Sequence, residues 1–143
     1  MKIAIIGFGN VGSALASKWA DAGHSIYVGV RNPSTHASHH LLEHPNVSIH
    51  VVAEAAENAQ VILLATPAPS AIEVAKSLGN TKGKFIIDAM NVGRGRGPQG
   101  FTNTSDAIVA HTDSRDVVKC FNTTGFNNML NTEYNGVKID AFV

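Results

Sequence analysis

Cysteine, net charge and long apolar runs are all scarce in this chain. Its 143 residues include a single cysteine, Cys120, so no disulfide can form within the chain, and so few cysteines are typical of a reducing compartment. The 11 basic residues are balanced by 11 acidic ones, which removes the electrostatic attraction that nucleic acids or anionic membranes require. No run of about 18 apolar residues is present, so no segment is predicted to span a membrane.

The apolar N-terminus does not have the pattern of a signal peptide. A lysine precedes the run, but Gly7, Gly9 and Asn10 interrupt it before an apolar core of sufficient length can form. We therefore expect a cytoplasmic protein that has neither a nucleic-acid partner nor a membrane partner.

Short apolar segments alternate with helical ones along the whole chain, whose length suits one domain. This alternation is typical of an α/β fold in which helices cover both faces of a mainly parallel, doubly wound sheet. The expected strands are residues 2–6, 25–30, 47–52, 61–65, 84–89, 117–121 and 137–143. The expected helices are residues 13–22, 41–44, 54–59, 69–78 and 106–110.

A glycine motif follows the first predicted strand and precedes the first predicted helix. Gly7, Gly9 and Gly12 form the pattern G-x-G-x-x-G in the context that indicates dinucleotide binding. The first glycine permits a tight turn, the second lets a pyrophosphate approach the backbone, and the third lets the helix pack against the strand. The free N–H groups of the helix N-terminus favour the phosphates. The alternative is a glycine-rich turn in another doubly wound protein.

No acidic residue occurs between Asp21 and Glu43, where an NAD site would place a carboxylate on the ribose 2′-hydroxyl. The second predicted strand is instead followed by Arg31, Asn32 and Ser34. A guanidinium binds a 2′-phosphate that a carboxylate would repel, so the sequence favours NADP(H). The same absence is evidence against a methyltransferase. The alternative is a solvent-facing arginine.

The exits of the middle strands supply the other half of the expected crevice, because ligands of open α/β sheets lie beyond the carboxyl ends of the strands. Pro67 forces Thr66 into an extended conformation, which presents its backbone to the cleft. We expect these residues and the segment 88–91 to flank the nicotinamide.

Other polar groups allow two interpretations. Four histidines cluster at positions 36, 39, 40 and 44; if the segment is helical, His36, His40 and His44 share one face and could bind a metal, but a hydrated surface helix is the simpler interpretation. Arg94 and Arg96 could clamp an anionic acceptor or be solvated. Cys120 is expected to be buried and to pack in the core rather than to act as a nucleophile. Asp88, at the end of a predicted strand, could orient backbone or ribose groups of the site, or it could be a structural cap. No nucleophile–base pair is evident, which is compatible with hydride transfer by the cofactor.

Four segments resemble the NADPH-dependent reductases of the deazaflavin coenzyme F-420. They are residues 5–12, 29–33, 88–91 and 117–123, and the resemblance covers nearly the whole chain. It implies a Rossmann fold, NADP(H) as cofactor, and hydride transfer to a flavin-like acceptor. The candidate cofactor-binding residues are Gly7, Phe8, Gly9, Asn10, Val11, Gly12, Arg31, Asn32, Ser34, Ala65, Thr66, Pro67, Ala89 and Asn91.

The chain departs from this family in three places. Val30 stands where the family often has a serine, and Val92 follows Asn91 where it often has a proline. The family also carries a helical C-terminal segment that shapes the acceptor site and the dimer. We expect residues 1–143 to be the NADP-binding domain without that segment.

Two functions remain open at this point. The first is an NADP(H)-dependent oxidoreductase with a small-molecule hydride acceptor, of deazaflavin or flavin type. The second is a dinucleotide-binding module or redox sensor that performs no chemistry. A homodimer is compatible with both, because a strand that ends at Val143 could pair with a second copy.

Overall fold

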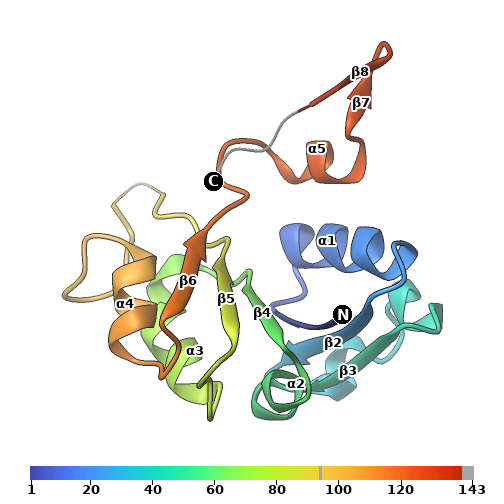
Figure 1. The fold of residues 1–143 in the computed structure, drawn as a ribbon. Helices are drawn as coiled ribbons and strands as arrows, with labels where there is room; N and C mark the ends of the chain where they lie inside the picture. The colour runs from blue at the N-terminus through green and yellow to red at the C-terminus, as the bar shows by residue number, and fades with distance from the viewer. Residues whose placement is uncertain (94, 140–143) are drawn as a thin grey trace.

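Six parallel strands form one sheet at the centre of the computed structural model, which describes residues 1–93 and 95–139 (Figure 1). The strands are β1 (Lys2–Ile6), β2 (Ser25–Val30), β3 (Val47–Val51), β4 (Val61–Leu64), β5 (Phe85–Asp88) and β6 (Asp116–Lys119). Their order across the sheet is β3-β2-β1-β4-β5-β6. The chain therefore winds outward from β1 in both directions, and a Rossmann-type fold has its ligand crevice where the order reverses, between β1 and β4.

Helices cover both faces of this sheet, as the alternation in the sequence predicts. The helices are α1 (Asn10–Asp21), α2 (Val52–Asn58), α3 (Ala71–Ser77), α4 (Thr104–Ala110) and α5 (Phe126–Leu130), with 3₁₀ turns η1 (Pro33–His36), η2 (His40–Glu43) and η3 (Ala68–Ser70). Within β1, Ile3 and Ile5 join the core beneath α1, whereas Ala4 and Ile6 join the core beneath α2, α3 and α4. Successive side chains of a strand point to opposite faces, so a sheet covered on both sides needs continuous apolar strands.

Helix α1 begins three residues earlier than the periodicity predicts. The carbonyl of Gly9 accepts hydrogen bonds from the backbone and the hydroxyl of Ser13, at 2.9 and 2.7 Å, so Gly9 is the N-cap and Gly12 lies in the first turn. The predicted end at Gly23 is confirmed by its positive φ of 84°. The backbone N–H groups of Gly23 and His24 donate to the carbonyls of Ala20 and Trp19, which closes the helix. Ala22, the last residue of the predicted helix, is the C-cap and is exposed.

Other boundaries differ from expectation by one to three residues. Val52 starts α2 rather than ending β3, and α3 is preceded by the turn η3 around Pro69. Helix α4 starts at Thr104 because the side chain of Asn103 caps it by accepting a hydrogen bond from the backbone of Asp106.

The C-terminal region is where the sequence-based prediction is wrong. Strand β6 ends at Lys119, and Phe121 adopts a positive φ of 65°, so the chain leaves the sheet earlier than expected. Helix α5 then packs beside α1 (Figure 1). Strands β7 (Glu133–Tyr134) and β8 (Val137–Lys138) form a separate antiparallel hairpin instead of a seventh strand of the main sheet. Residues 140–143 lie outside the described residues, so the expected dimer through Val143 stays a prediction.

Candidate functional site

In the glycine loop, the fold requires glycine at positions 7 and 12, whereas the space beside Gly9 is open. Gly7 has a φ of +102°, and a Cβ there would lie 2.6 Å from the carbonyl oxygen of Ala65. A Cβ on Gly12 would lie 2.0 Å from the carbonyl oxygen of Gly7. A Cβ on Gly9 would meet nothing within 4 Å. The loop is thus closed toward the sheet and open at its middle glycine, as a cradle for a pyrophosphate requires.

A cavity of about 830 Å³ lies beside this loop, at the carboxyl ends of β1, β2, β3 and β4. It has the size of a small-molecule or cofactor site. Its lining consists of Ile6, Gly7, Phe8, Gly29, Val30, Arg31, Asn32, Thr35, His36, Val51, Val52, Ala53, Thr66, Pro67, Pro69, Ser70, Glu73, Val74 and Ser77.

The exit of β2 is a tight turn built on Asn32. The side-chain oxygen of Asn32 accepts hydrogen bonds from the backbone and the hydroxyl of Ser34, at 3.2 and 2.7 Å. The hydroxyl of Thr35 donates to the backbone carbonyl of Asn32 at 2.8 Å. The side-chain oxygen of Asn32 is therefore occupied within the turn, and the hydroxyls of Ser34 and Thr35 both donate to Asn32. Ser34 itself does not line the cavity, and its contact with the cofactor stays a prediction.

Arg31 lies at the mouth of the cavity with its hydrogen-bonding capacity unused. It is exposed, and its guanidinium forms no ion pair and no hydrogen bond with any residue that the structure describes. A planar guanidinium with five free N–H donors, set beside an open glycine loop, is suited to bind a phosphate. The nearby amide nitrogen of Asn32 likewise has no acceptor in the described part of the chain.

The structure gathers only part of the predicted site around the cavity. Six predicted residues line it: Gly7, Phe8, Arg31, Asn32, Thr66 and Pro67. Residues 9–12 form the N-terminus of α1 next to it, and Ala65 backs onto Gly7. Ala89, which is nearly buried, and Asn91, which is exposed, lie past the end of β5 and outside the cavity lining.

The sequence-based prediction missed the far wall of the cavity. Val51, Val52 and Ala53 close it from the β3 exit, and Glu73 and Val74 close it from α3. The β3 exit could have been anticipated, since all parallel strands of one sheet end at the same edge. The position of His36 could not, because it depends on how η1 folds back over Phe8.

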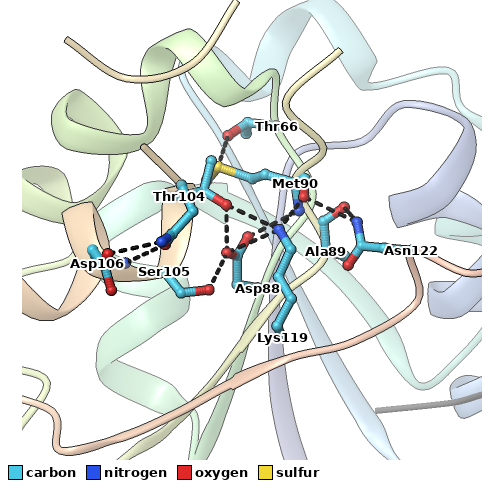
Figure 2. A network of polar contacts seen from close by, with 10 residues as sticks. Thr66, Asp88, Ala89, Met90, Thr104, Ser105, Asp106, Lys119 and Asn122 are labelled. Carbon is cyan, nitrogen blue, oxygen red and sulfur yellow. Dashed lines mark hydrogen bonds and ion pairs between the residues drawn. The ribbon is translucent and has the colours of Figure 1, made fainter. Parts of the chain in front are cut away.

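A second polar group lies at the same sheet edge, beyond β5 and β6 (Figure 2). Asp88 is completely buried, and its carboxylate accepts hydrogen bonds from the hydroxyls of Thr104 and Ser105, at 2.5 and 2.7 Å, and from the backbone of Met90 at 3.0 Å. Lys119 completes the set with an ion pair at 3.1 Å. Of the two roles considered for Asp88, the structural one is observed, because it ties β5 to the start of α4.

The chain segment after β5 is held in place by its neighbours. The ammonium of Lys119 also donates to the carbonyl of Met90, and the amide nitrogen of Asn122 donates to the carbonyls of Ala89 and Met90, at 3.4 and 3.0 Å (Figure 2). The hydroxyl of Thr66 approaches the sulfur of Met90 at 3.9 Å, which links the exits of β4 and β5. The amide oxygen of Asn122 is buried and finds no donor among the described residues.

The remaining candidate side chains are spread over the described surface. No cluster of three metal-ligating side chains occurs within residues 1–93 and 95–139. His44 lies 3.6 Å from Asp21, at the surface. Cys120 is half-buried rather than buried. Arg96 is exposed and does not line the cavity, and Arg94 lies outside the described residues.

No helix in the described residues has both the length and the apolar character needed to cross a membrane.

Similarity to known proteins agrees with this geometry. The family described as NADP oxidoreductase coenzyme F420-dependent matches residues 2–92. A crystal structure from Arthrobacter sp. FB24, of a protein provisionally assigned as an F420-dependent NADP reductase, is 28% identical with a TM-score of 0.78, and the match covers 95% of this chain and 70% of that one. No curated protein sequence matches the chain.

More distant structures share the fold. A hypothetical protein from Sinorhizobium meliloti is 24% identical with a TM-score of 0.76, and the match covers 95% of this chain and 68% of that one. An imine reductase from Aspergillus terreus, solved with NADPH4, is 19% identical with a TM-score of 0.61, over 83% of this chain and 39% of that one.

The open glycine loop and the unpaired guanidinium fit the phosphates of NADP(H), which is the cofactor of this family. The match spans well over half of the chain and includes both features. The chain therefore belongs to the NADP oxidoreductase coenzyme F420-dependent family and has its Rossmann-type fold.

Proposed function

We propose that this protein transfers hydride between NADP(H) and a deazaflavin- or flavin-like acceptor, with residues 1–143 as the NADP-binding domain. The observation that carries the proposal is the position of Arg31, a cation at the exit of β2 that pairs with no described residue and lines the same cavity as Gly7 and Phe8. NAD-binding sites use a carboxylate at this exit, and a guanidinium there selects the cofactor with the additional phosphate.

The phosphates are bound at two places in this proposal. The pyrophosphate approaches Gly9, where there is open space, and receives hydrogen bonds from the free N–H groups at the start of α1. Arg31 and the amide nitrogen of Asn32 contact the 2′-phosphate. Ser34 acts on the phosphate only through Asn32, since its hydroxyl donates to the oxygen of that side chain. Val30 stands where the family often has a serine, so one hydrogen-bond donor to the 2′-phosphate is lost. Recognition of the 2′-phosphate therefore depends more on Arg31.

The nicotinamide lies toward the exits of β4 and β5, next to Thr66, Pro67 and residues 89–91. Bound NADPH supplies the hydride, so the protein needs to orient the ring and exclude water rather than provide a nucleophile. The contacts of Lys119 and Asn122 with the Met90 carbonyl hold the β5 exit in place for that purpose. The type of acceptor rests on the family description and on the provisional assignment of the Arthrobacter relative.

The test is turnover with defined acceptors. NADPH is mixed with the purified protein and either a deazaflavin or a flavin, and the loss of the nicotinamide absorbance is followed, with NADH in a parallel reaction. We expect oxidation of NADPH that depends on the acceptor and is much slower with NADH. Tight binding of NADPH without turnover by either acceptor would favour a dinucleotide-binding module or redox sensor instead.

A further inference from the structure

The histidines that follow β2 lie around the aromatic ring of the glycine loop. The ring of His36 meets the ring of Phe8 edge-on, with centroids 6.0 Å apart, and the ring of His39 lies on Phe8 at 4.1 Å. His40 stacks on His39 at 4.6 Å. Phe8 lies between the first two glycines of the motif, so these contacts bring a group of imidazoles to the phosphate-binding end of the cavity.

Of these three histidines, His36 alone lines the cavity. Its ring nitrogens form no hydrogen bond with any residue in the described ranges, whereas Nδ1 of His39 accepts one from the backbone of Leu41 at 3.3 Å. His36 is half-buried and adjoins Arg31, Asn32 and Thr35 in the cavity wall. Both ring nitrogens of His36 are therefore available to hydrogen-bond a ligand at the phosphate-binding end of the cavity.

Basic side chains lie around His36. Arg31 lines the cavity from the β2 exit, and His39 and His40 lie behind. Burial, and then the neighbouring His40 and His36, lower the pKa of His39, which is what crowded imidazoles without a counter-ion produce.

The 3₁₀ turn η1, which carries His36, contains no acidic residue. Glu73, on α3, is the sole carboxylate among the lining residues. Glu43 lies in η2, and Glu54 is paired with His50 of β3 at 3.0 Å. The lining cation Arg31 and the imidazole of His36 thus come from the β2 exit and from η1, whereas the lining carboxylate comes from α3.

We propose that protonated His36 is a second cation for the 2′-phosphate of NADP(H), so that the preference for NADP(H) over NAD(H) increases as the pH falls. This inference rests on the proposed function. An imidazole ordinarily titrates near pH ~6.5, and a phosphate monoester loses its second proton near pH ~6. Over the interval from about pH 8.5 to about pH 6.5, acidification therefore favours the charged form of imidazoles in general, while a phosphate monoester keeps most of its charge.

The experiment measures the Kd of NADPH and of NADH at both pH values for the wild type, His36→Gln, His36→Lys and the control His44→Gln. His44 is a half-buried histidine that pairs with Asp21 and does not line the cavity. In the wild type, the ratio of the two Kd values should shift by about fivefold toward NADPH on acidification. His36→Gln should abolish that shift, and His36→Lys should keep the preference for NADPH at both pH values. His44→Gln should behave as the wild type.

Each contrary result has a separate meaning. A wild-type protein that prefers NADPH but shows the same shift after His36→Gln overturns the role of His36 and leaves the proposed function intact. An equal pH shift for NADH and NADPH overturns the assignment to the 2′-phosphate, because the pyrophosphate is common to both. A wild type without any preference for NADPH contradicts the proposed function itself. Thermal unfolding of each variant verifies that it is folded, and His36→Lys tests the charge even if His36→Gln is unstable.

Discussion

The two ends of the site differ in how their polar groups are used. At the β5 exit, the carboxylate of Asp88 accepts from four donors, and Lys119 adds bonds to Met90 and Thr104. At the β2 exit, the side chains of Arg31 and His36 form no hydrogen bond and no ion pair with any described residue. Hydrogen bonds that are already formed within the chain stabilise the fold, whereas free donors beside a cavity are available to a ligand. Substitutions should therefore affect stability at the first end and cofactor binding at the second.

The largest effect is expected where the glycine loop is part of the fold. Gly12→Ala would place a Cβ 2.0 Å from the carbonyl oxygen of Gly7, and neither backbone segment can move without shifting α1 or β1. We expect a loss of at least about 3 kcal/mol in the free energy of unfolding, measured by urea denaturation. A variant that unfolds at the same urea concentration as the wild type would show that the loop is less constrained than the distances indicate.

The next largest effect is the loss of stability expected when Asp88, at the β5 exit, is replaced. Asp88→Ala removes the acceptor of two hydroxyls, one backbone N–H and one ammonium, in a place without solvent. We expect a destabilisation of about 3 kcal/mol, less if Lys119, whose side chain is 40% exposed, can turn to water. Asp113→Ala is the control, since it changes an exposed carboxylate. A destabilisation no larger than that of the control would contradict the structural role of Asp88.

Gly9→Ala tests the open part of the loop and should separate binding from folding. Its Cβ meets nothing within 4 Å, so the melting temperature should stay close to that of the wild type. The methyl group would occupy space that the pyrophosphate needs, and NADPH and NADH should both bind about tenfold more weakly, as measured by calorimetry. Unchanged affinity for both cofactors would remove Gly9 from the pyrophosphate site.

The smallest effect concerns the histidines at the β2 exit. The lowered pKa of His39 means that the folded protein binds this proton less readily than the unfolded chain. Its stabilising contribution is complete above the ordinary value near ~6.5 and is lost as the pH falls through the lowered folded pKa. His39→Gln should therefore reduce the fall in melting temperature on acidification. Parallel profiles for variant and wild type would show that His39 does not contribute.

Much of the fold follows from the sequence because its main signals are local. The strands at residues 2–6 and 25–30 are confirmed with their bounds, since each is a short apolar run that ends beside glycine or a charged residue. The C-terminal hairpin was missed, although Asn135 and Gly136 have the positive φ values, 52° and 79°, that are typical of this turn sequence. The apolar end of the chain outweighed that signal in the prediction.

The site is less predictable because it depends on where separate segments meet. The glycine motif and Arg31 are predicted from their order along the chain, and Gly7, Phe8 and Arg31 line the cavity. The pairing of Asp88 with Lys119 required the strand order, since the two residues are 31 positions apart and are direct neighbours only when β5 and β6 are adjacent. The contact of His36 with Phe8 depends on the path of two 3₁₀ turns, for which the sequence has no periodic signal.

The most direct test of the account is the affinity of the wild type and of Arg31→Ala for NADPH and NADH, with Arg115→Ala as a control at an exposed position outside the cavity lining. The account predicts that the wild type binds NADPH at least about tenfold more tightly than NADH and that Arg31→Ala loses most of this preference. The affinity for NADH should be nearly unchanged, and Arg115→Ala should retain the preference. Equal losses for both cofactors in Arg31→Ala, or a wild type without preference, would contradict it.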